Sequence, residues 1–111
     1  MRERDIEAYL VERVKAMGGE VRKVKWIGRN SAPDRLVMLP HRTLWPTFYV
    51  ADSLQRQAEM IWVELKNPKT VASFPANARE RAQAREHVRM RKMGQRVEVI
   101  GTLEGVETLL S

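Results

Sequence analysis

The sequence predicts an α/β domain in which a small mixed β-sheet is flanked by helices. Two patterns predict this class. Apolar residues recur at helical spacing near both ends of the chain, and apolar runs of strand length lie between them. The predicted order is helix, three strands, helix, strand, helix. Because 111 residues suffice for one compact domain but not for two ordinary ones, we expect a single domain over residues 1–111.

The first predicted helix covers residues 3–17 and ends at Gly18-Gly19. Its apolar stripe consists of Ile6, Leu10, Val14 and Met17. Counting 100° per residue puts two acidic residues, Glu3 and Glu7, on or beside this stripe, with Glu3 nearer its centre.

Three strand-like runs follow this helix. The first begins at Val21 and includes Val24 and Trp26, the second covers residues 36–39, and the third covers residues 60–66. Between the second and third runs lies an insertion, Pro40 to Glu59, which is longer than a usual hairpin loop. Phe48-Tyr49-Val50 can form a short extra strand within it, so we expect an elaborated hairpin.

The remaining chain alternates again between helix and strand. A helical pattern runs from Pro75 through Met93, and Gly94 is suited to end it. Residues 96–100 alternate as a strand, and residues 103–110 suggest a short terminal helix.

Composition limits the class of protein and of site. Hydrophobic residues make up 43% and charged residues 31% of the chain, a balance typical of a globular protein. The sequence contains neither an apolar run of membrane-spanning length nor the apolar region of a signal peptide, which predicts a cytoplasmic protein. With no cysteine, a metal ion must be held by oxygen atoms or by His41 and His87.

The positive charge is concentrated in one segment. The chain has 20 basic and 14 acidic residues, and residues 66–96 alone carry nine basic and two acidic ones, a net charge of +7. Such a segment is typical of a protein that binds a phosphate backbone, although a charge run by itself more often marks a solvated helix face. The candidate phosphate contacts are Lys69, Arg79, Arg81, Arg85, Arg89, Arg91 and Lys92.

Three polar residues at strand boundaries form a candidate catalytic site. Asp34 opens the second predicted strand, and Glu64 and Lys66 end the third on one face, because side chains alternate along a strand. If these strands pair, Asp34 can lie opposite Glu64. Two carboxylates can then hold Mg²⁺, while Lys66 orients or deprotonates the water that attacks a phosphate.

These motifs, in this order, resemble those of the PD-(D/E)xK nuclease superfamily. Within it, Asp34-Arg35-Leu36-Val37, Val63-Glu64-Leu65-Lys66, Gln83 ahead of Gly94 and the run Val97–Ile100 resemble the virus-type replication-repair nuclease (VRR-NUC) family. The opening residues 2–7 and Gly18-Gly19 are similar to its stand-alone phage and bacterial members. The resemblance spans nearly the whole chain apart from the insertion. Where relatives often carry a glycine two residues before the Pro-Asp pair, this chain has Ser31.

The resemblance implies a restriction-endonuclease-like core and a set of site residues. Asp34, Glu64 and the backbone carbonyl of Leu65 would hold the metal, Mg²⁺ with Mn²⁺ as a substitute. Lys66 would be the catalytic lysine, and Gln83 the helix residue that faces the site. An acidic residue of the first helix would complete the metal site, and the spacing leaves Glu3 and Glu7 as alternatives.

The implied function is that of a metal-dependent endonuclease acting on branched DNA such as four-way (Holliday) junctions, in repair and in phage-infected or bacterial cells. Two symmetric cuts need two sites, so we expect a homodimer, with the segment from Pro40 to Glu59 at or near its interface. The alternative is a non-catalytic nucleic-acid-binding module with the same fold. A plain protein-interaction domain would leave the basic segment and the three-residue site unexplained.

Overall fold

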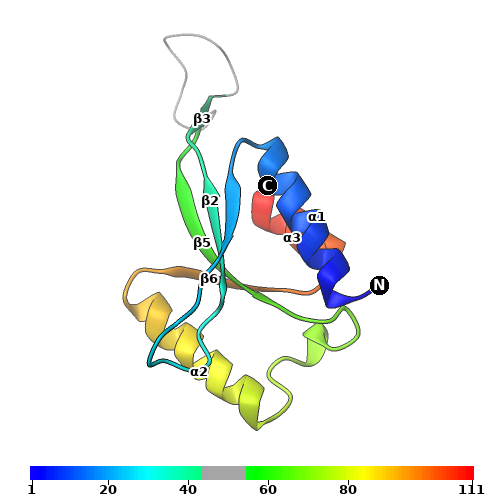
Figure 1. The fold of residues 1–111 in the computed structure, drawn as a ribbon, viewed down its shortest axis with the longest axis vertical. Helices are drawn as coiled ribbons and strands as arrows, with labels where there is room; N and C mark the ends of the chain where they lie inside the picture. The colour runs from blue at the N-terminus through cyan, green and yellow to red at the C-terminus, as the bar shows by residue number, and fades with distance from the viewer. Residues whose placement is uncertain (44–54) are drawn as a thin grey trace.

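The structure, a computed structural model, describes residues 1–43 and 55–111. Three α-helices and six short or medium strands follow one another in the described residues (Figure 1). In chain order they are α1 (Glu3–Ala16), β1 (Glu20–Lys23), β2 (Arg35–Leu39), β3 (Arg42–Thr43), β4 (Gln55–Arg56), β5 (Glu59–Leu65), the 3₁₀ turn η2 (Val71–Ser73), α2 (Ala78–Lys92), β6 (Arg96–Ile100) and α3 (Leu103–Leu110).

The main sheet has four strands in the order β1-β2-β5-β6. β1, β2 and β5 are antiparallel neighbours, whereas β5 and β6 run parallel, with α2 as the crossover between them. β2 pairs with β5 so that Arg35 lies opposite Val63 and Leu36 opposite Trp62. The predicted mixed sheet is therefore confirmed.

Helices α1 and α3 cover one face of the sheet (Figure 1). Ile6, Leu10 and Val14 of α1 are fully buried there against alternate residues of β5, Ile61 and Val63. Full burial of each such aliphatic side chain contributes about 1.5–3 kcal/mol relative to exposure. This layer forms the main hydrophobic core.

Helix α2 covers the opposite face, and its buried side is mostly polar. Only Met90 joins a small apolar cluster with Trp62 of β5 and Val97 of β6. The other buried residues of α2 are Glu80, Gln83, Glu86 and His87. Because burying polar groups costs free energy unless they are hydrogen-bonded, this side of α2 is expected to form a specific polar site.

Glycines end two of the helices as predicted. Gly18 and Gly94 adopt φ of +83° and +85°, in the left-handed region that favours glycine. The amide of Gln95 donates to the carbonyl of Met90, closing the last turn of α2. At its other end α2 begins at Ala78, slightly after the expected start, because the side chain of Asn77 caps the amide of Glu80.

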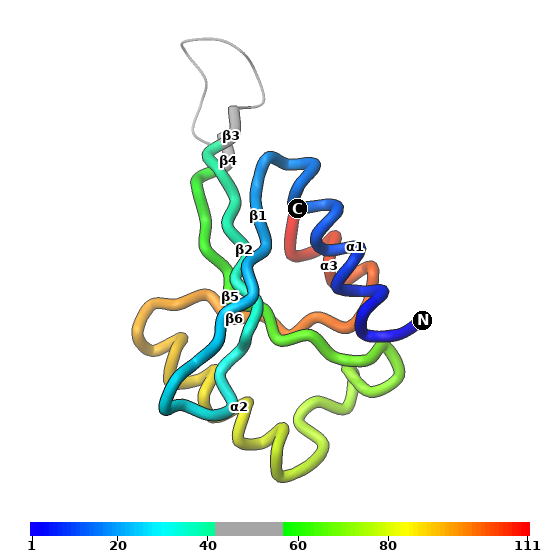
Figure 2. The backbone as a smooth tube through the Cα atoms, viewed as in Figure 1, coloured from blue at the N-terminus to red at the C-terminus, as the bar shows by residue number. Residues whose placement is uncertain are grey.

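The tube in Figure 2 shows where the insertion leaves the sheet, beyond the ends of β2 and β5. β3 and β4 pair as a short two-stranded ladder at its base, as an elaborated hairpin requires. The expected extra strand Phe48-Tyr49-Val50 lies outside the described residues. Among the described helices, none has the length and apolar character needed to cross a membrane.

Candidate active site

The register of β2 and β5 brings the three predicted catalytic residues to one face of the sheet. Arg35 pairs with Val63, so the next position of the same register sets Asp34 opposite Glu64. Directly opposite residues of antiparallel strands project to the same side. Glu64 and Lys66 also share this side, since the amide of Lys66 extends the ladder by bonding the carbonyl of Ile100.

The ammonium group of Lys66 is held by two residues of α2. Its Nζ donates to Oε1 of Gln83 at 2.7 Å and lies 3.3 Å from Oε2 of Glu80. The Lys66 side chain is only 13% exposed, and its Nζ also lies 5.2 Å from the ring centre of Phe74. Gln83, which the resemblance assigned to the site, therefore contacts the candidate catalytic lysine directly.

Glu80 is itself fixed in the ionised form. Its Oε1 accepts a hydrogen bond from the backbone amide of Ala76 at 2.8 Å. This hydrogen bond, together with the hydrogen bond and positive charge of Lys66, lowers the pKa of Glu80 despite the opposing effect of burial. Lys66 thus has a permanently charged partner near neutral pH.

The carboxylate of Glu64 is buried and contacts a buried histidine. Oε1 of Glu64 lies 3.2 Å from Nε2 of His87, whose side chain is 1% exposed. The His87 ring stacks on Phe74 with 5.8 Å between ring centres. His87 is therefore a hydrogen-bonded near-core residue that orients Glu64.

Asp34 lies at the open side of the site, with its side chain 51% exposed. Arg35 links it to α1: one guanidinium nitrogen lies 3.0 Å from Oδ1 of Asp34, and Nε donates to Oε2 of Glu7. Burial lowers the pKa of Arg35, but the hydrogen bond to Glu7 and the charge of Asp34 outweigh it and raise this pKa.

The two acidic candidates of α1 are placed differently. Glu7 contacts Arg35 beside Asp34, whereas Glu3 is exposed at the start of the helix. The placement of Glu3 near the centre of the buried face was wrong, because the buried stripe begins only at Ile6. Of the two, Glu7 is the residue beside the site.

The loop that leads into Asp34 is fixed at several points. Trp26 donates from its indole nitrogen to the carbonyl of Pro33 at 2.8 Å, next to Asp34. Ser31 adopts φ of +71°, in the left-handed region that is uncommon for residues other than glycine. Arg29 forms two hydrogen bonds, of 2.6 and 2.8 Å, with the buried carboxylate of Glu86 on α2.

The donor set suits a hard divalent cation. Asp34 and Glu64 offer carboxylate oxygens on one face of the sheet, and Leu65 offers a backbone carbonyl between Glu64 and Lys66. Within residues 1–43 and 55–111, no three His, Asp or Glu side chains lie close enough together to form a complete metal site. Arg35 occupies the space between Glu7 and Asp34, so Glu7 could join a metal only if this guanidinium turned away.

The predicted phosphate contacts lie on α2 and in the segment before it, and all seven are exposed. Arg81, Arg85 and Lys92 share one stripe at helical spacing, opposite the buried side. Arg81 and Arg85 form no ion pair or hydrogen bond with any residue that the structure describes. Arg89 instead contacts Glu86, and Arg91 donates to the carbonyl of Val97.

The sequence did not single out Glu80, Arg35 or Phe74. Glu80, Gln83 and His87 follow one another three and four residues apart, which is the spacing of one helix face. That spacing could have added Glu80 to the site. Nothing in the sequence brings Phe74 together with Lys66 and His87, because the connection between β5 and α2 determines its position.

The fold and the polar face under α2 define a nuclease-type α/β domain. A solved structure described as a "VRR_NUC domain" is 33% identical to this chain, with a TM-score of 0.66, and the match covers 97% of this chain and 92% of the other. No family model and no curated protein matches the sequence. The chain belongs to the VRR-NUC family of nuclease domains.

Proposed function

We propose that this protein is a metal-dependent endonuclease that hydrolyses phosphodiester bonds of DNA and selects branched substrates such as four-way junctions. The observation that carries the proposal is the convergence of Asp34, Glu64 and Lys66 on one face of the sheet. Family membership supports a nuclease, and the exposed stripe of Arg81, Arg85 and Lys92 supports a phosphate-backbone substrate.

Each residue has a distinct role in the proposed reaction. Asp34, Glu64 and the carbonyl of Leu65 would hold Mg²⁺, or Mn²⁺ in its place. The ion would neutralise charge that builds up on the phosphate during attack. Lys66, held by Gln83 and Glu80, would orient or deprotonate the attacking water. His87 would keep the Glu64 carboxylate in position.

The test uses labelled linear, flap, splayed-arm and four-way-junction DNA with the purified protein. Each DNA is incubated with Mg²⁺, with Mn²⁺ and with a chelator. Cleavage that requires a divalent ion and is fastest on a branched DNA is expected. Metal-independent cleavage, or equal rates on linear and branched DNA, would contradict the corresponding half of the proposal.

The alternative is a binding module of the same fold without turnover. DNA binding with no cleavage under any of these conditions would favour it. The complete set of Asp34, Glu64 and Lys66, with Lys66 already held in place, favours the enzyme, because a module that only binds needs none of these contacts.

We further propose that the protein acts as a homodimer. Each chain carries one Asp34–Glu64–Lys66 set, whereas a junction is resolved by two symmetric cuts. Light scattering should give about twice the chain mass of 12.9 kDa. A monomeric mass with and without junction DNA would remove this part of the proposal and leave a nuclease that makes single nicks.

A further inference from the structure

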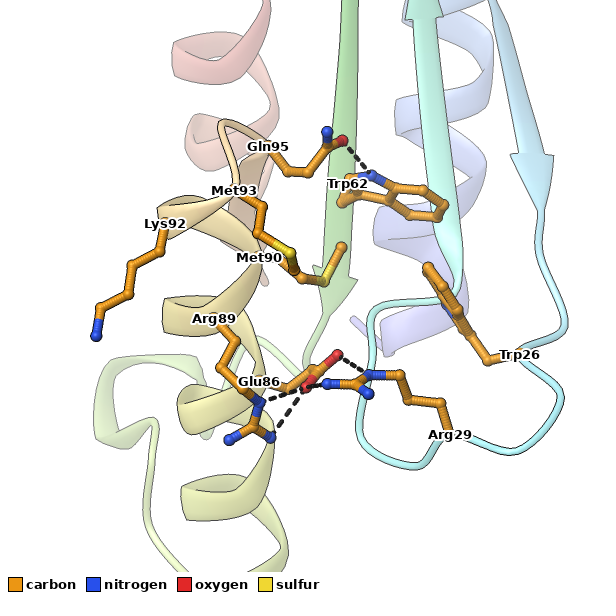
Figure 3. Close-up of a pocket in the computed structure, with 9 residues that line it drawn as sticks. All are labelled: Trp26, Arg29, Trp62, Glu86, Arg89, Met90, Lys92, Met93 and Gln95. Atoms are coloured by element: carbon orange, nitrogen blue, oxygen red, sulfur yellow. Dashed lines mark hydrogen bonds and ion pairs between the residues drawn. The ribbon is translucent and has the colours of Figure 1, made fainter.

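A cavity lies beside the candidate active site on the same face of the sheet. It has a volume of about 740 Å³ and opens between the loop before β2 and the end of α2 (Figure 3). Its lining is shared between apolar and charged side chains: Trp26, Trp62, Met90, Met93, Arg29, Glu86, Arg89, Lys92 and Gln95.

The cavity follows the active site along β5. Every second residue at the end of β5 lies on the face covered by α2, namely Trp62, Glu64 and Lys66. Trp62 is therefore two residues, or about 6.6 Å along the strand, from Glu64. Residues of α2 contact these strand residues in matching order. Gln83 contacts Lys66, His87 contacts Glu64, and Met90 packs in one cluster with Trp62. The cavity therefore begins where the site ends.

Aromatic and sulfur-containing side chains form the apolar part of the cavity. Trp26 and Trp62 lie with ring centres 5.1 Å apart and their planes inclined by 43° (Figure 3). Met93 is 68% exposed beside them, which is unusual for a large apolar side chain. The Trp62 indole donates to Oε1 of Gln95 at 3.1 Å, which leaves the Gln95 amide group as a donor at the cavity.

Cationic side chains lie at the edge of this apolar surface: Arg29 and Arg89 both contact Glu86, and Lys92 extends outward from α2 (Figure 3). Arg29, Arg89 and Lys92 line the cavity together with the carboxylate of Glu86, so its net charge is +2. Lys92 also belongs to the basic stripe of α2 with Arg81 and Arg85. A ligand that suits this arrangement has a flat apolar face and a negatively charged backbone.

We propose that this cavity binds an unpaired nucleobase of the DNA substrate, next to the phosphodiester bond that is cut. The base would stack on Trp26 and pack against Met93, and Lys92 would contact a neighbouring phosphate. Stacking on aromatic side chains is the usual way in which proteins hold unpaired bases. The inference rests on the proposed function and would explain a preference for branched DNAs with single-stranded arms, such as flaps and splayed arms. In a four-way junction all bases are paired, so a base pair at the branch point would first have to open.

The test compares a splayed-arm DNA with matched DNAs that each lack one base near the branch. Each abasic DNA keeps the phosphate backbone, so only the contacts of the missing base are removed. Binding is measured in a chelator, which separates it from cleavage. The wild-type protein should bind one of the abasic DNAs at least about fivefold more weakly than the intact DNA. Equal binding of all these DNAs would overturn the inference.

Two matched variants locate the effect. Met93→Glu places a charge in the cavity, and Val88→Glu places the same charge on α2 outside it, where Val88 is 47% exposed. Met93→Glu should abolish the preference for the intact base, and Val88→Glu should keep it even if overall affinity falls. A preference for the intact base that survives Met93→Glu would overturn the inference. If Met93→Glu also loses the dimer mass while keeping this preference, a second copy of the chain covers the cavity instead of a base.

The two proposals fail separately. Base-dependent binding without metal-dependent cleavage would contradict the proposed nuclease and keep the cavity as a base-binding site. Cleavage of branched DNA without any base dependence of binding would keep the nuclease and reject the cavity.

Discussion

The contacts of Lys66 predict a graded loss of activity when the lysine or its partners are changed. Lys66→Ala removes the group proposed to act on the attacking water, and general acid–base groups typically contribute about 10²–10⁴-fold to a rate. Gln83→Ala removes only the 2.7 Å hydrogen bond to Nζ, while Glu80 still contacts the ammonium group. A hydrogen bond to a charged group contributes about 1.5–3 kcal/mol, so the rate should fall by roughly 10- to 150-fold at most.

The assay is single-turnover cleavage of a labelled branched DNA with protein in excess, so that product release does not limit the rate. Lys15→Ala is the matched control, because it removes the same charge from an exposed position on α1. It should cleave at the wild-type rate. Circular dichroism and thermal unfolding of all three variants would show whether a loss of rate reflects a loss of fold.

Two results would refute this reasoning. Turnover of Lys66→Ala within tenfold of the wild-type rate would remove Lys66 from the chemistry. An equal loss in Gln83→Ala and Lys66→Ala would mean that Gln83 acts on the reacting atoms itself, and not through Lys66.

Three further predictions concern the metal, the DNA and acid stability. Asp34→Ala should weaken Mn²⁺ binding in a calorimetric titration, whereas Lys66→Ala should not; the same affinity in both would contradict the metal site. Arg81→Ala should lower the slope of log affinity against log salt by about one without changing sequence preference, and an unchanged slope would assign its charge to solubility. The pKa values of Glu80 and Glu86 are lowered, so their contribution to stability is complete above the ordinary glutamate pKa of about 4.3 and is lost as pH falls through the folded-state values. In the Glu86→Gln variant, the free energy of unfolding should fall less steeply as the pH is lowered than in the wild type. The same fall in both proteins would contradict this prediction.

The sequence predicted the sheet and the three catalytic candidates because these follow local rules. Alternation along β5 determines that Glu64 and Lys66 share a face, and the apolar runs determine which strands exist. The prediction that Asp34 lies opposite Glu64 depended on the pairing of β2 with β5, and that pairing is confirmed. Gln83 was placed at the site by the family resemblance, and helical periodicity added only that it lies on the side of α2 opposite the arginine stripe.

Residues that depend on loop paths could not be predicted in this way. The Arg35 side chain points to the α1 side of the sheet, where it contacts Glu7, and it also contacts Asp34. Nothing in the sequence predicts this double contact. The Arg29–Glu86 contact joins residues that are 57 positions apart, and only the folded loop brings them together. The error on Glu3 has the same origin, because helical periodicity states which side is apolar but not where along the helix burial begins.

The polar inner side of α2 explains how a helix with few apolar residues can pack on a sheet. Its attachment relies on specific contacts: Gln83 with Lys66, His87 with Glu64, and Glu86 with Arg29. Two of these three contacts hold proposed catalytic groups, and the third fixes the loop before Asp34. Because the same interactions hold the helix and order the site, a substitution that disrupts either is expected to disturb the other. The outer side of α2 is free of this constraint, which is why it can carry the arginine stripe that we expect to meet DNA.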